Sequence, residues 1–137
     1  RAQLRIGRKI GRKKEGTPYE RWGGDAFFFD LVDRFYDDVA TDPLLAHMFP
    51  EDLTEPKDHF ARFLIQFWGG PTTYSERRGH PRLRMRHARF AIGTAEAEAW
   101  LGHMAAAVRA SGMEPDDEEE LLEYLTMAAR SLVNTPA

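Results

Sequence analysis

The chain has 137 residues and a formal net charge of -3 at pH 7, and this length fits one domain with a single core. It has no cysteine, which excludes disulfides and thiolate-held metals, so any metal must be bound by nitrogen or oxygen. No run of about eighteen apolar residues is present, and the sequence therefore predicts no membrane insertion and no secretory signal, but a cytoplasmic protein.

The charge is unevenly distributed, because seven Lys and Arg residues fall within residues 1–16. This stretch has too few apolar side chains to pack into a core, and we expect it to be a disordered N-terminal extension. Residues 17–137 are then the folded domain. A short basic tail can bind nucleic acid or anionic lipid, but a solvated extension is the more common role.

The first part of this domain predicts one long helix and two short ones. Apolar side chains recur at helical spacing over residues 25–40 and form one broad face. A short helix over residues 18–22 precedes a pair of glycines, which permit a sharp change of direction. Asp42 is a good N-cap and Pro43 suits a first helical position, so residues 43–48 predict another short helix.

The middle of the chain predicts an aromatic-rich helix followed by a long irregular segment. Residues 56–68 place several Phe and a Trp on one stripe, and Gly-Gly-Pro ends this helix. Residues 72–92 show no clean periodicity and carry six Arg between positions 77 and 89. This composition predicts a structured loop with short helical turns.

Two further helices complete the domain. Thr94 is a candidate N-cap for a helix that ends at residue 110, and a last helix begins after Pro115 with acidic residues in its first turn. No segment alternates with period two, so the predicted fold class is all-α with four main helices. The long irregular connection between the middle pair argues against a plain four-helix bundle.

The five histidines do not form a compact metal-binding set such as His-Glu-x-x-His. The sequence also has no Gly-x-Ser-x-Gly elbow and no glycine-rich phosphate loop, so it predicts neither an ordinary hydrolase nor a kinase. By spacing alone, a single histidine such as His87 in an Arg-rich loop is more often a surface residue than a metal ligand. Spacing and periodicity therefore identify no site.

The segment FWGGPTTYSERRGHPRLRMRHARF, which spans residues 67–90, closely resembles the signature of the group II truncated haemoglobins. The resemblance covers about residues 19–135 and includes RFYDDVATDPLL and EYLTMAARSLVN. It implies a truncated globin, a two-over-two helical sandwich around a non-covalent b-type haem (iron protoporphyrin IX). The residue that matches the proximal iron ligand is His87, and His80 is the weaker candidate.

The resemblance also implies how the haem is held. The aromatic side chains expected to bury the porphyrin are Phe49, Phe60, Phe63, Phe90 and Trp100, although each phenylalanine could equally be ordinary core. The haem propionates need cationic or hydroxyl partners, for which Arg84 and Tyr74 are the candidates. His59 lies where it could approach the haem edge.

On the distal side, the resemblance points to Tyr36 and Trp100, whose O–H and N–H groups can donate hydrogen bonds to a bound ligand. Phe49 stands at a position where many relatives have Tyr. This substitution removes one potential donor, so a cage of three donors around the ligand is not expected.

The function implied by the resemblance is reversible binding of O2, or of CO, NO or sulfide, in a role such as oxygen transport. The alternative on the same haem is enzymatic turnover, either NO dioxygenation or peroxidase-like chemistry. Turnover needs electrons, and because the chain carries no flavin or NAD domain, a separate reductase would have to supply them. The sequence does not decide whether the protein forms a homodimer. A haem-free nucleic-acid-binding module is a third hypothesis, but the net acidic body and the lack of a nucleic-acid motif argue against it.

Overall fold

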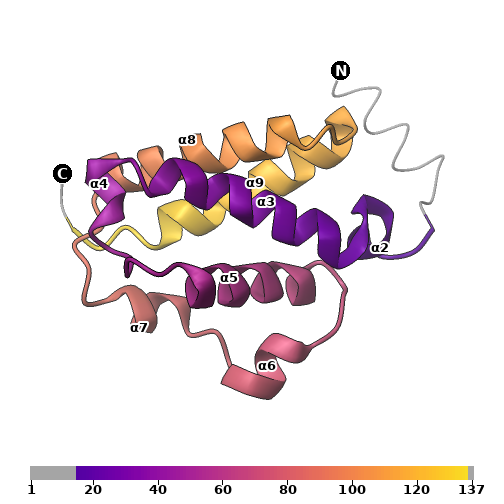
Figure 1. Cartoon of the computed structure of the whole chain (residues 1–137), viewed down its shortest axis with the longest axis horizontal. Coiled ribbons are helices and arrows are strands. Elements are labelled where there is room, and N and C mark those ends of the chain that lie inside the picture. The colour runs from indigo at the N-terminus through magenta and orange to yellow at the C-terminus, as the bar shows by residue number, and fades with distance from the viewer. Residues whose placement is uncertain (1–14, 136–137) are drawn as a thin grey trace.

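The computed structural model describes residues 15–135, which form helices and loops without a strand (Figure 1). The helices are α2 (Pro18–Trp22), α3 (Gly24–Val39), α4 (Pro43–Ala46), α5 (Thr54–Phe67), α6 (Thr73–Arg78), α7 (Leu83–His87), α8 (Thr94–Ala110) and α9 (Pro115–Ser131). The predicted all-α class is confirmed. The extension predicted for residues 1–16 lies outside the described residues, apart from its last two. Within the described part, no helix has the length and apolar character needed to cross a membrane.

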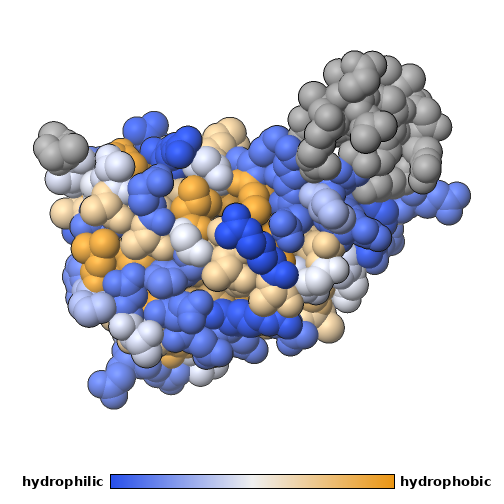
Figure 2. Space-filling view, turned by 90° about the horizontal axis from the view of Figure 1, so that it is seen from above, coloured by the Kyte–Doolittle hydropathy of each residue, from blue (hydrophilic) through white to orange (hydrophobic). Residues whose placement is uncertain are grey.

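Two helix pairs make the body of the molecule. α3 packs on α5, α8 packs on α9, and contacts between α3 and α8 join the two pairs. Figure 1 shows α8 above α3 and α5 below it. This is the two-over-two arrangement that the resemblance implied. The outer face in Figure 2 is mostly hydrophilic with small hydrophobic patches, as expected of helices whose apolar sides turn inward.

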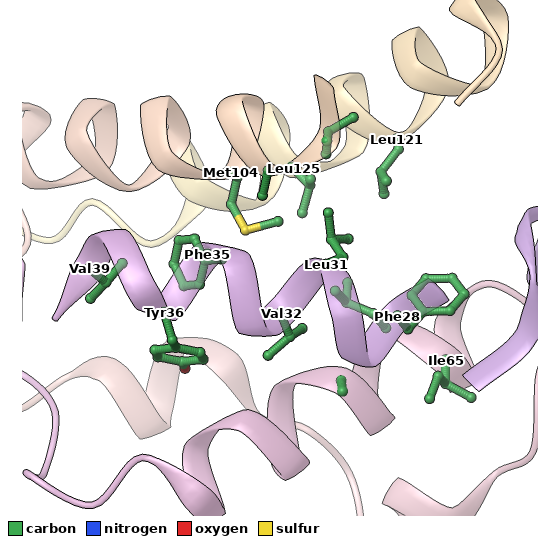
Figure 3. Packing of buried hydrophobic residues seen from close by; sticks show 14 of the residues in the cluster. Phe28, Leu31, Val32, Phe35, Tyr36, Val39, Ile65, Met104, Leu121 and Leu125 are labelled. Carbon is green, nitrogen blue, oxygen red and sulfur yellow. The ribbon is translucent and has the colours of Figure 1, made fainter. Parts of the chain in front are cut away.

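Helix α3 supplies the centre of the core. Its buried side chains recur every three or four positions and are Phe28, Leu31, Val32, Phe35, Tyr36 and Val39. In Figure 3, Met104 of α8 and Leu125 of α9 lie above α3, whereas Tyr36 lies below it. The two sides of this helix therefore face different parts of the molecule.

Helix α2 covers the N-terminal end of α3. Thr17 and Glu20 form a capping box at its start, in which each side chain accepts a hydrogen bond from the other residue's amide. The Tyr19 amide donates to the Trp68 carbonyl at 2.9 Å and so ties α2 to the end of α5. A Cβ atom on Gly70 would lie 2.7 Å from the Tyr19 ring, and this close approach requires glycine.

The observed helix boundaries lie within two residues of the predicted ones, with one change in capping. Asp42 caps α4 as predicted, since its carboxylate accepts a 2.9 Å hydrogen bond from the amide two residues on. Helix α5 begins at Thr54, two residues before the predicted start. This start places Pro56 in the first turn, where no backbone N–H is needed. The prediction of Thr94 as N-cap is wrong: Gly93 precedes the helix, and its amide donates to Glu96 Oε1 at 2.7 Å.

The irregular stretch after α5 contains α6 and α7, which confirms the predicted loop with short helical turns. Arg82, the residue before α7, has a φ of 49°, a left-handed conformation that side chains seldom adopt. No residue of α7 is buried. This short helix therefore depends less on packing than the helices of the sandwich do.

Candidate functional site

A cavity of about 370 Å³ lies at the C-terminal end of α3, between the sandwich and α7. Its lining is largely apolar and includes side chains from α3, α5, α7, α8 and α9. The aromatic residues in the lining are Tyr36, Phe49, Phe60, Phe63, Tyr74, Phe90, Trp100 and Tyr124. All of the aromatic side chains expected around the porphyrin, together with the predicted Tyr74, are thus brought to one space.

Tyr36 and Trp100 both line this cavity, and each side chain carries one hydrogen-bond donor. The Tyr36 ring packs edge-on against Phe35 and Phe49, with centroid distances of 5.0 and 5.4 Å. Burial raises the pKa of Tyr36 above its usual value, so its hydroxyl keeps its proton and acts as a donor. Within residues 15–135, neither the Tyr36 hydroxyl nor the Trp100 indole N–H has a hydrogen-bond partner. Both are therefore available to a ligand.

His87 is the last residue of α7 and lies in the lining. Its Nδ1 is 2.6 Å from the Leu83 carbonyl oxygen, one helical turn earlier. Because a carbonyl can only accept, Nδ1 carries the proton and donates it. The neutral ring then has an unprotonated Nε2, the atom that binds a metal in most histidine-ligated sites. A backbone carbonyl thus fixes both the tautomer and the ring orientation.

The other two histidines considered for the site differ from each other. His80 is exposed, accepts a 3.0 Å hydrogen bond from the Arg82 amide and is outside the cavity lining. His59 lies in the lining, where its Nε2 accepts from Arg78 Nη1 at 3.1 Å. Burial, followed by the charge of Arg78, lowers the pKa of His59 and favours its neutral form.

Cationic side chains border the cavity, but the predicted one is not among them. Arg78, Arg86 and Arg89 contribute to the lining, whereas Arg84 borders a neighbouring depression together with the C-terminal segment. On a helix with about 3.6 residues per turn, Arg84 lies to one side of the face that carries Leu83, Arg86 and His87. Sequence reasoning missed the three arginines because residues 77–89 contain several and their spacing does not identify the inward ones.

Tyr74 is buried, lines the cavity and lies beneath the guanidinium group of Arg78, whose Cζ is 5.8 Å from the ring centroid. Its hydroxyl has no hydrogen-bond partner in the described part of the chain. A cation and a hydroxyl next to each other form a suitable partner for a carboxylate.

These features fit a haem. A porphyrin supplies four nitrogen ligands to its iron, so the protein needs to contribute only one axial ligand, an apolar sleeve and partners for two propionates. In this chain His87 Nε2, the aromatic lining, and Arg78 beside Tyr74 can supply them. The described residues contain no group of three or more His, Asp or Glu side chains that could hold a bare metal ion.

Comparison with known proteins agrees with this geometry. The model of the bacterial-like globin family matches residues 17–134. The group 2 truncated hemoglobin YjbI of Bacillus subtilis is 44% identical over 118 residues, which are 86% of this chain and 89% of that protein.

Solved structures show the same relation. The hemoglobin of the thermophilic phototrophic bacterium Chloroflexus aurantiacus is 51% identical, with a TM-score of 0.85 over 88% of this chain and 99% of that one. The truncated oxygen-avid haemoglobin of Bacillus subtilis is 44% identical, with a TM-score of 0.82 over 87% of this chain and the whole of that one. The chain therefore belongs to the bacterial-like globin family, and within that family to the group II truncated haemoglobins.

Proposed function

We propose that this protein binds one non-covalent haem b in the cavity through His87 and reversibly binds O2 there. Globins are haem proteins that bind small gaseous ligands, and family membership brings that general function to this chain. The finer assignment is supported by the donors and by a structural relative described as oxygen-avid.

The observation that carries the proposal is the position of complementary groups around one apolar cavity. His87 comes from α7 on one side, and Tyr36 and Trp100 come from α3 and α8 on the other (Figure 1). Held by His87, a haem would supply an iron that can bind a diatomic gas reversibly. Two protonated donors without partners favour a ligand that develops negative charge, which distinguishes O2 from CO.

Each residue has a separate task in this proposal. His87 holds the haem through Nε2 while the Leu83 carbonyl orients the ring. The aromatic lining excludes water, and Arg78 with Tyr74 provides a place for a propionate. Phe49 lacks a hydroxyl, so only Tyr36 and Trp100 of the predicted distal residues donate to the gas.

The decisive experiment is an absorption spectrum of the purified protein, reduced and then exposed to CO. We expect a Soret band that shifts with CO, and a haem that acidic organic solvent extracts because it is not covalently attached. The absence of a Soret band after reconstitution with haemin would overturn the proposal.

The axial ligand is tested by His87→Gly, with His80→Gly as the matched control, since His80 is exposed and outside the lining. His87→Gly is expected to lose its haem or its normal ferrous spectrum and to regain the spectrum when imidazole is added. His80→Gly is expected to behave like the unchanged protein. If His80→Gly lost the spectrum and His87→Gly did not, His80 would be the axial ligand and His87 would not.

A further inference from the structure

The C-terminal segment that follows α9 returns to the loop behind α7. Here the Asn134 amide donates to the Ile92 carbonyl at 2.8 Å, and the Thr135 amide donates to the same oxygen at 3.1 Å. The Ile92 amide in turn donates to Asn134 Oδ1 at 2.9 Å. Both polar backbone groups of Ile92 are thus paired with a residue 42 positions away.

The other half of the Asn134 side chain reaches α7 itself. Its Nδ2 donates to the Phe90 carbonyl at 3.0 Å and, more weakly, to the His87 carbonyl at 3.4 Å. The Thr135 hydroxyl donates to Asn134 Oδ1 at 2.9 Å, which leaves Nδ2 directed at the two carbonyls. The Asn134 side chain therefore accepts a hydrogen bond from Ile92 and donates to the carbonyls of Phe90 and His87.

Within the described residues, few other interactions hold helix α7 in place. It has five residues, none of them buried, and its N-cap makes no side-chain hydrogen bond. The hydrogen bonds of Arg86 go to the Pro81 and Arg78 carbonyls, within the same stretch of chain. For residues 80–93, the only hydrogen bonds that the described part of the chain supplies from outside residues 78–97 come from Asn134 and Thr135.

We infer that Asn134 is a positioning residue, which holds the C-terminal end of α7 and thereby sets the position of His87 toward the haem. The inference rests on the proposed function, because it assumes that His87 is the axial ligand. Asparagine suits the task since it combines an acceptor and two donors on one short side chain. Aspartate at this position would keep the acceptor, but its second carboxylate oxygen would face the carbonyls of Phe90 and His87 and could not donate to them.

The experiment compares Asn134→Ala and Asn134→Asp with Ser131→Ala in the haem-loaded protein. Ser131 is a fitting control because it lies in the same region and, within residues 15–135, its hydroxyl bonds only to the Ala128 carbonyl. Asn134 is exposed, but its Oδ1 is the acceptor for the amide of buried Ile92, so we expect the thermal midpoint to fall in Asn134→Ala and to change little in Asn134→Asp, which keeps the acceptor. We expect the iron–histidine stretching band in resonance Raman spectra of the ferrous protein to shift or broaden in both Asn134 variants. Transfer of haem to apomyoglobin should become about tenfold faster, as expected for losing one or two hydrogen bonds to carbonyls.

Amide hydrogen exchange adds a readout that does not depend on haem chemistry. The Ile92 amide should lose protection in Asn134→Ala and keep it in Asn134→Asp, which still offers an acceptor. If Asn134→Ala does not fold, Asn134→Asp is the deciding variant, because it retains the bond from the Ile92 amide and loses only the donors to the Phe90 and His87 carbonyls.

The outcomes separate the two proposals. An iron–histidine band and a haem-transfer rate equal to those of Ser131→Ala would overturn the role of Asn134, while His87→Gly still responded to imidazole. A normal ferrous spectrum in His87→Gly without imidazole would instead overturn the axial assignment on which the inference depends.

Discussion

At the N-terminal end of α3, the ring of Phe28 is completely buried, whereas at the C-terminal end the ring of Tyr36 borders the cavity. Phe28 contacts Tyr19, Trp22 and Phe27, with ring centroids between 5.0 and 6.1 Å away. Short helix α2 brings two of these rings over the end of α3 and closes it.

At the other end, the rings meet edge-on around a space instead of filling it. Phe35 lies 5.6 Å from Phe60 and 5.5 Å from Trp100, and Tyr36 lies 5.4 Å from Phe49. The helices α4 and α7, which contribute to the cavity lining here, have only four and five residues. Similar aromatic side chains therefore build a closed core at one end of a helix and a binding cavity at the other, depending on what covers them.

The largest expected effect is on the free energy of unfolding, which Phe28→Ala should lower more than Phe60→Ala does. Removing a fully buried ring leaves a void, and Phe28→Ala should cost about 3 to 5 kcal/mol of unfolding free energy. Phe60 is half-buried beside an existing cavity, so its loss should cost about 1 to 2 kcal/mol. Urea denaturation at matched haem content measures both.

Gas binding should show the opposite order. Rates of CO rebinding after photolysis should change in Phe60→Ala and stay unchanged in folded Phe28→Ala, because only Phe60 borders the cavity. Equal changes in both variants would mean that the two ends are not separate in function.

The second effect concerns the donors, tested with Tyr36→Phe and Trp100→Phe. A hydrogen bond to a charged acceptor is worth about 1.5 to 3 kcal/mol, so losing one donor should speed O2 dissociation by about ten- to a hundredfold. CO dissociation should change far less, since CO carries little negative charge. Because both donors address one small ligand, the effects in the double variant should not simply add.

The closed end supplies matched controls for these substitutions. Tyr19→Phe removes a hydroxyl that bonds to Asp25 at 2.7 Å, and Trp68→Phe removes an indole outside the cavity. Stopped-flow O2 dissociation should be unchanged in both. Unchanged release in Tyr36→Phe and Trp100→Phe would remove these two residues from the proposed role, and equal acceleration for O2 and CO would mean that the pocket had only been loosened.

The contrast between the two ends also explains what the sequence could predict. Helical periodicity located α3 and its buried face correctly, because apolar spacing depends only on which side of a helix is covered. It could not separate Phe28, which is core, from Phe60, which lines the cavity, since both stand on apolar stripes of their helices. That distinction came from the resemblance to a family and then from the three-dimensional arrangement.

Polar contacts across the fold were harder to predict. Nothing near Arg84 in the sequence shows that Arg78, Arg86 and Arg89, rather than Arg84, line the cavity. The bonds from Asn134 to the loop behind α7 join residues more than forty positions apart, and no local pattern announces them. Local rules describe helices and caps, whereas such contacts depend on how the helices meet.

The smallest expected effect concerns the polar link that holds α4 at the cavity end. His103 Nε2 of α8 donates to Asp42 Oδ2 at 2.7 Å, while the other carboxylate oxygen caps α4. The hydrogen bond from His103, and then the one from the α4 amide, hold the pKa of Asp42 below its usual value of about 3.9. A lowered pKa in the folded state stabilises the fold above the unfolded-state pKa, and this contribution is lost as pH falls through the folded-state pKa.

Asp42→Asn tests this link, because asparagine still caps a helix but carries no charge. Its stability deficit against the unchanged protein, from urea midpoints between pH 6 and pH 3, should be constant at the upper end and shrink toward the lower. Asp52→Asn is the matched control: hydrogen bonds from Thr54 also lower the pKa of Asp52, but no histidine of the described residues contributes to that shift. The acid-dependent change should therefore be larger for Asp42→Asn. Equal changes in the two variants would show that His103 adds nothing, and a deficit that grows toward low pH would show that the link has the opposite sign.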